Sequence, residues 1–199
     1  MEMERTALGF RVKSGWALAV LIGGSASAPQ VIDRRRIELA DASVPESTQP
    51  FHAALDLPKA AGAKVVARLV KVVETYSQRT VAGLVNRYRA GGHRIIAAGI
   101  VVGSTVDPKT IKNDHIRAHA EEGRLFRVVV RDALKKSRLK TSVIPEKEMI
   151  AKAVKALGIS EQKLKAGLVE MGKAVDGSWR AEDKAAALAA WIALKDSSK

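Results

Sequence analysis

Two histidines and a glutamate near the middle of the chain have the spacing that metal binding or acid–base chemistry requires. His119 follows His115 by four residues, and Glu122 follows His119 by three. On a helix such side chains share one face, so two imidazoles can reach one divalent metal ion while the carboxylate acts as a third ligand or a base. The sequence therefore predicts a catalytic or metal-binding group of His115, His119 and Glu122. The alternative is that they satisfy backbone groups where the helix meets the sheet.

Five basic residues follow on the same predicted helix and fall within one narrow arc of its surface. They are Arg124, Arg127, Arg131, Lys135 and Arg138. Apolar residues such as Phe126 and Val130 fall on the opposite side, so the helix is amphipathic. Such a basic stripe either follows the phosphates of a nucleic acid or is a solvated helix face.

Four further cations are candidates for phosphate contacts. Arg11 and Lys13 lie at the end of the first predicted strand, and Arg34 and Arg36 share one face of the third. These side chains either contact phosphates or pair with nearby acids such as Glu38.

The overall composition narrows the choice of partners. Lysine and arginine give this chain of 199 residues a net charge of +13, which favours nucleic acid or another phosphorylated ligand. Cysteine is absent, which excludes disulfides, a cysteine nucleophile and thiolate zinc sites. No apolar run approaches the roughly 18 residues that span a bilayer. We therefore expect a cytoplasmic protein with no membrane partner and no obligatory cofactor, with a divalent metal as the open alternative.

Hydrophobic periodicity predicts the elements that position these residues. Strands are expected at residues 6–12, 16–22 and 30–39, followed by a long helix that starts at 59 or 63 and ends at 89. A strand at 94–102, a helix from 113 or 114 to 137 and a short strand at 141–144 come next. Three helices follow, at 146–157, 160–173 and 180–194, and form a helical C-terminal part at 146–199. Prolines at 45, 50 and 58 predict a long loop at 39–61, either ordered or mobile.

Side-chain patterns add detail to two of these elements. On the first strand, large apolar residues alternate with Gly9 and Arg11, which is typical of a half-buried strand. On the last helix, alanines gather on one side and favour a close approach to the sheet. Leu188 and Trp191 lie on the other side, where we expect them to pack against the preceding helices or to form a homodimer contact.

Two segments carry a resemblance to a known family. Residues 8–20 (LGFRVKSGWALAV) resemble an opening hairpin, and residues 181–189 (AEDKAAALA) a closing helix, of the ribonuclease H-like superfamily, in its Holliday-junction resolvase branch. The resemblance implies a single α/β domain over residues 1–199. Its three layers would be a mixed five-stranded sheet, with a meander of three strands and two parallel strands, and helices on both faces. It also implies that Glu182 and Asp183 approach His115, His119 and Glu122 beyond the strand ends, as one catalytic pocket.

The sequence departs from that family at the positions that hold two magnesium ions. The resemblance places a carboxylate where this chain has Arg11, and a glutamate at the end of the strand at 94–102, where it has none. Of two acids spaced three apart on the closing helix, Asp183 fits one, while Arg180 stands at the other. Because magnesium is normally anchored by carboxylates, conventional two-metal nuclease activity is not expected.

Three functional hypotheses remain from the sequence. The first is a basic ribonuclease H-like module that binds nucleic acid without standard nuclease activity. The second is a hydrolase or nuclease with an altered His/Glu/Asp site that acts on a phosphorylated substrate. The third is a structural or assembly protein that forms a homodimer. We favour the first, because the charge supports it and the family's acids are largely missing.

Overall fold

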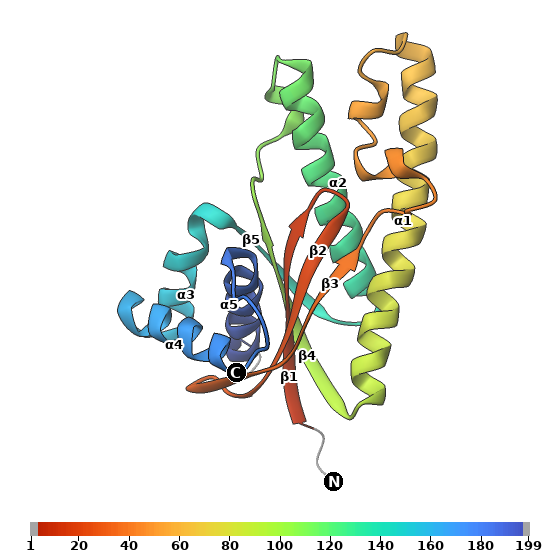
Figure 1. The fold of residues 1–199 in the computed structure, drawn as a ribbon. Coiled ribbons are helices and arrows are strands. Elements are labelled where there is room, and N and C mark those ends of the chain that lie inside the picture. Colours follow the sequence, from red (N-terminus) through yellow and green to blue (C-terminus); the bar gives the residue numbers. More distant parts are fainter. Residues whose placement is uncertain (1–3, 197–199) are drawn as a thin grey trace.

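The computed structural model describes residues 4–196 as a twisted sheet between two groups of helices (Figure 1). The sheet has five strands in the order β3-β2-β1-β4-β5. Strands β1 (Glu4–Lys13), β2 (Trp16–Ser25) and β3 (Ala28–Glu38) form the expected antiparallel meander. Strand β4 (His93–Val102) pairs in parallel with β1, and β5 (Lys140–Pro145) pairs in parallel with β4. The mixed sheet expected from the sequence is confirmed.

One face of the sheet is covered by α1 (Lys59–Ala90) and α2 (Asp114–Lys136), which pack on a core centred on Phe10, Ile100 and Phe126. The other face is covered by α5 (Ala181–Asp196), with α3 (Met149–Leu157) and α4 (Glu161–Lys173) outside it. Figure 1 shows these two helical layers on opposite sides of the sheet. No helix within residues 4–196 is long and apolar enough to cross a membrane.

Strand β1 is buried on both faces, which corrects the expectation of a half-buried strand. Residues 6–12 are all buried, Arg11 included. The reason is the close approach of α5: a Cβ atom on Gly9 would lie 2.6 Å from the backbone nitrogen of Ala190 and closer still to the carbonyl oxygen of Ala186. Gly99 on β4 meets Ala189 in the same way. Glycine on the strands and alanine on the helix therefore set this short distance between layers.

Helix α5 is buried on every side between Ala185 and Leu194. Trp191 packs its ring against Gly167 of α4, and its indole nitrogen donates a hydrogen bond to the carbonyl oxygen of Ala26 at 2.8 Å. Leu188 is fully buried in the same cluster. The expected packing of Leu188 and Trp191 on preceding helices is thus observed, and these two side chains are not exposed for a dimer contact.

The proline-containing segment between β3 and α1 is folded around two short 3₁₀ helices. These are η1 (Pro45–Thr48) and η2 (His52–Ala54), and α1 starts directly after Pro58. The buried Ser47 hydroxyl accepts a hydrogen bond from the backbone nitrogen of Asp41 at 3.1 Å, which closes the segment on itself. Of the two sequence alternatives for this loop, the structure therefore shows the ordered one.

Candidate functional site

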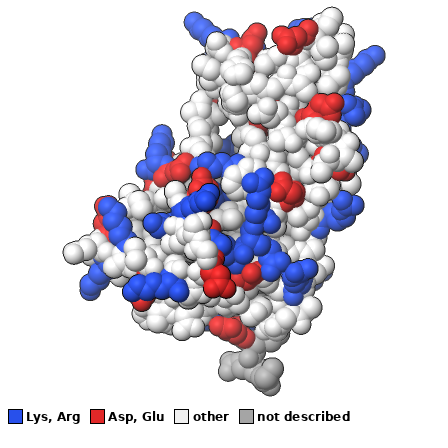
Figure 2. Space-filling view, viewed as in Figure 1, with Lys and Arg blue, Asp and Glu red and all other residues white. Residues whose placement is uncertain are grey.

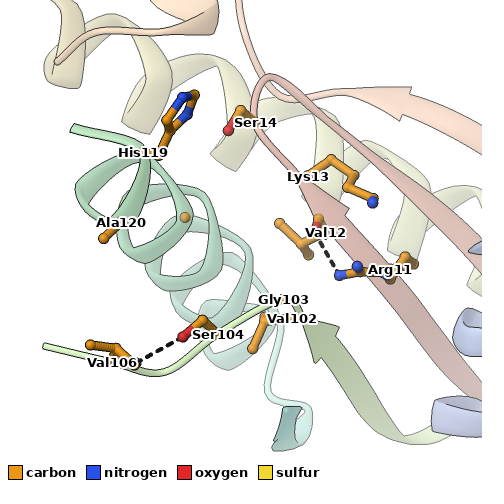
Figure 3. Close-up of a pocket in the computed structure, with 11 residues that line it drawn as sticks. Arg11, Val12, Lys13, Ser14, Val102, Gly103, Ser104, Val106, His119 and Ala120 are labelled. Atoms are coloured by element: carbon orange, nitrogen blue, oxygen red, sulfur yellow. Dashed lines mark hydrogen bonds between the residues drawn. The ribbon is translucent and has the colours of Figure 1, made fainter. Parts of the chain in front are cut away.

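A pocket of about 280 Å³ opens at the carboxyl ends of β1 and β4, beside the first turns of α2 (Figure 3). Arg11 and Lys13 line it from β1, Ser104 from the loop after β4, and His119 from α2. Figure 3 shows Arg11 and Lys13 on one side, with His119 and Ser104 on the α2 side. The strand ends thus bring together residues that are about a hundred positions apart, as expected for an open α/β sheet.

Arg11 occupies the first-strand position where the family resemblance calls for a carboxylate. Its side chain is only 4% exposed, and its guanidinium lies 2.6 Å from a carboxylate oxygen of Glu146. Glu146 opens the short 3₁₀ helix η4 (Glu146–Glu148) directly after β5. Two residues along β1, the ammonium of Lys13 lies 3.6 Å from Glu182 at the start of α5. The two cations that line the pocket from β1 are therefore both held in ion pairs.

The pocket does not fit two magnesium ions. Magnesium needs converging carboxylate and water oxygens, whereas Arg11 and Lys13 place two cations there and engage Glu146 and Glu182. Val102 at the end of β4 lines the pocket, as do Gly103, Ser104 and Val106 of the loop that follows, and none of these residues carries a carboxylate. The donor set argues against a two-metal centre, in agreement with the departures seen in the sequence.

Asp183 has a structural position at the beginning of α5. One of its carboxylate oxygens accepts a hydrogen bond from the backbone nitrogen of Arg180 at 2.6 Å, which satisfies a free N–H at the start of the helix. The other oxygen lies 3.2 Å from the guanidinium of Arg34. Arg34 also donates to the carbonyl oxygens of Ser178 and Asp176. Within residues 4–196, the side-chain hydrogen-bond and ion-pair partners found for Asp183 are Arg34 and Arg180, and Glu122 is not in contact with it through either.

The four cations predicted on β1 and β3 are each paired with a carboxylate. Besides the three pairs already described, Arg36 lies 2.7 Å from Glu38 and stacks over the ring of Trp16. Figure 2 shows basic and acidic side chains next to one another near the centre of the view. Because each is paired with a carboxylate, these four cations attract an incoming phosphate less strongly than unpaired cations would.

The basic stripe on α2 is much less neutralised. It consists of Arg124, Arg127, Arg131, Lys135 and, just beyond the helix end, Arg138. Arg131 pairs with its neighbour Asp132 at 2.9 Å, but no other ion pair within residues 4–196 involves a member of the stripe. Partial burial, together with the nearby charges of Arg124 and Arg131, lowers the pKa of Arg127 below its usual value. The electrostatic repulsion between such closely spaced cations decreases when an anion binds.

The stripe begins at the edge of the pocket. Gly123 of α2 lines the pocket, and Arg127 lies one helical turn further on. Arg127 donates a hydrogen bond at 3.1 Å to the carbonyl oxygen of Ser104, which is itself a pocket residue. Asn113 caps the start of α2, because its side-chain oxygen accepts a hydrogen bond from the backbone nitrogen of Ile116. The pocket and the stripe therefore form one continuous surface.

The predicted trio on α2 meets a histidine that sequence reasoning missed. His52 of η2 lies against His115 and His119, with ring centroids 4.7 and 4.2 Å away. Glu122 is fully buried behind these rings, and one of its oxygens lies 2.8 Å from Nδ1 of His52. The only sequence signal for His52 was its position in a long loop, where functional residues often occur.

The fold of residues 4–196 is the ribonuclease H-like α/β fold. Two solved structures show the likeness over nearly the whole chain. Thermus thermophilus RuvC is 8% identical, with a TM-score of 0.55, and the match covers 94% of this chain and 92% of that one. T. thermophilus RuvC in complex with a Holliday junction substrate is 7% identical, with a TM-score of 0.56, and the match covers 95% and 92% of the two chains. The expected ribonuclease H-like fold is thereby confirmed. No protein-family model and no curated protein sequence matches the chain.

Proposed function

We propose that this protein is a nucleic-acid-binding module of ribonuclease H-like fold that lacks standard two-metal nuclease activity. The observation that carries the proposal is the contrast between its two groups of cations. On β1 and β3 each predicted cation is paired with a carboxylate, whereas on α2 the arginines crowd one another. A surface of closely spaced arginines gains from phosphate contacts and from the counterions that these contacts release.

The position of the α2 stripe also supports the proposal. The stripe runs from the pocket at the strand ends toward the end of α2, so a nucleic-acid backbone can follow it while the pocket edge receives a phosphate or sugar. Arginine provides a planar fork of donors for phosphate oxygens. One of the structural neighbours is a protein in complex with a Holliday junction. Branched DNA is therefore the first ligand to test.

The absence of conventional cleavage follows from the Arg11–Glu146 pair. A buried cation at the end of β1 repels magnesium and engages the carboxylate of Glu146, while Lys13 engages that of Glu182. Removing Glu146 would leave Arg11 unpaired, and removing Arg11 alone would free only the single carboxylate of Glu146. A nuclease centre of the two-metal kind would need several changes together.

The test is equilibrium binding of a labelled four-way DNA junction, a DNA duplex and an RNA duplex, followed by fluorescence anisotropy over a series of salt concentrations. We expect the affinity to fall steeply with salt. The double variant Arg124→Gln/Arg127→Gln should reduce the log–log salt slope on duplex DNA by about 1.8, since each lost phosphate contact contributes about 0.9.

The matched control is Lys152→Gln/Lys165→Gln, which removes the same charge from α3 and α4. These lysines are exposed and pair with Glu148 and Glu161 on their own helical segments. The control should retain the salt slope of the unmodified protein. Equal slopes for both double variants, or no binding at low salt, would contradict the proposal.

A further inference from the structure

Three of the four histidines in the sequence converge at one point, outside the Arg11 ion pair and off the α2 stripe. His52 comes from η2, while His115 and His119 stand on successive turns of α2. One ring nitrogen from each lies within 4.8 Å of the other two. The segment between β3 and α1 thus meets the start of α2 at a cluster of three imidazole rings.

This separation is close to that of a mononuclear metal site. Imidazole nitrogens bind Zn²⁺ at about 2.0 Å, so two ligands of a tetrahedral centre lie about 3.3 Å apart. His115 and His119 are exposed, and rotation of these two side chains can close the remaining gap. His52 is mostly buried and supplies the fixed member of the set.

Glu122 orients His52 in the way that a supporting carboxylate orients a metal-bound histidine. Its Oε1 lies 2.8 Å from Nδ1 of His52 and accepts a second hydrogen bond from the His52 backbone nitrogen at 3.2 Å. A proton on Nδ1 leaves the Nε2 lone pair free. Nε2 is buried and has no hydrogen-bond partner in the described chain. A carboxylate–histidine pair with a free second nitrogen is the usual arrangement behind a metal ligand.

The charge balance points the same way. Glu122 is fully buried. Its ion-pair partners within residues 4–196 are His52 and His119, and no lysine or arginine is among them. Its second oxygen is buried without a hydrogen-bond partner. A carboxylate in this position is costly unless a positive charge lies nearby. A dication held by the three histidines would supply that charge.

We propose that His52, His115 and His119 bind one divalent transition-metal ion, with Zn²⁺ as the expected metal and Glu122 as the positioning carboxylate behind His52. Three neutral imidazoles suit zinc, cobalt, nickel or copper better than magnesium or calcium. The exposed His115 and His119 leave the outer side of the ion open to water. The ion joins η2 to α2 and thereby fastens the proline-containing segment beside the pocket.

The experiment uses the full chain without a histidine tag, stripped of metal with a chelator and dialysed. Zn²⁺ is titrated against a chromophoric competitor, and Co²⁺ is added in parallel to record the visible absorption of a site with nitrogen ligands. We expect one ion per chain. At a hundredfold excess over the dissociation constant, Zn²⁺ should raise the melting temperature by about 5–10 °C.

Variants assign the site. His115→Ala and His119→Ala should each weaken binding by more than about 100-fold, because each removes one of three ligands. Glu122→Gln should keep one ion per chain but weaken binding by about 10- to 100-fold. The matched control is His93→Ala, since His93 lies by Glu4 and Tyr88 instead. That variant should bind Zn²⁺ as the unmodified chain does.

The folding of each variant is checked by its melting temperature in chelator, where metal plays no part. The proposal is overturned if the stripped chain takes up no stoichiometric Zn²⁺, or if His115→Ala and His119→Ala bind as tightly as His93→Ala. Because none of these readouts involves nucleic acid, the result is separate from the test of the α2 stripe.

Discussion

Replacement of Gly9 by alanine tests the contact that defines the layering of this fold. The added Cβ would lie 2.6 Å from the backbone nitrogen of Ala190, where ordinary contact begins at 3.4 Å. Helix α5 would have to move by at least 0.8 Å at this point, and by more at the nearer carbonyl oxygen of Ala186. Overpacking against backbone atoms costs about 3 kcal/mol. For a chain of this size, that lowers the melting temperature by about 6–12 °C.

The assay is thermal unfolding followed by circular dichroism, with Gly83→Ala as the control. Gly83 lies on the exposed side of α1, where an added Cβ would meet nothing within 4 Å. Alanine is there a better helix former, so this control should gain about 0.5–1 kcal/mol. A Gly9→Ala protein that melts within about 2 °C of the unmodified chain would refute the close packing of α5 on β1.

Two further predictions concern α5 and the segment after β3. Asp183→Ala should destabilise the protein by about 2–4 kcal/mol, since it removes the hydrogen bond to the Arg180 nitrogen and the partner of Arg34; a loss below about 1 kcal/mol in urea unfolding would contradict this role. Hydrogen bonds from Ser43 lower the pKa of Asp41 below its ordinary 3.8. That depressed pKa contributes stability above about pH 3.8 that is lost as the pH falls through the folded-state value. Ser43→Ala should raise the Asp41 pKa in an NMR titration, and an unchanged pKa would count against the bond.

The sequence predicted the elements well because their hydrophobic periods are clear. The meander, the long α1 and the parallel β4 each have a regular pattern bounded by glycine or proline, and the structure has them within a few residues. What periodicity could not show is burial imposed by a partner element. From its alternating pattern, the first strand was expected to have one exposed side, and Arg11 falls on that side. In the structure Arg11 is buried, because α5 covers this face of the sheet and Glu146 pairs with the guanidinium.

For the candidate metal ligands, the sequence could place together only those residues that share one helix. The spacing of His115, His119 and Glu122 placed them on the same side of α2, as the structure does. His52 lies 70 residues from Glu122 in the chain, and no local pattern connects a loop histidine with a distant helix. In the same way, the pairing of Arg34 with Asp183 and of Lys13 with Glu182 depends on tertiary contacts between the sheet and α5.

The central proposal is that this protein of ribonuclease H-like fold binds nucleic acid, and that Arg11 stands where the family resemblance places a metal-binding acid. The most direct measurement incubates a labelled four-way junction with the protein and Mg²⁺, and analyses the same sample on native and denaturing gels. The account predicts a salt-sensitive complex on the native gel and intact strands on the denaturing gel. Strand cleavage that depends on Mg²⁺, or the absence of a complex at low salt, would contradict it.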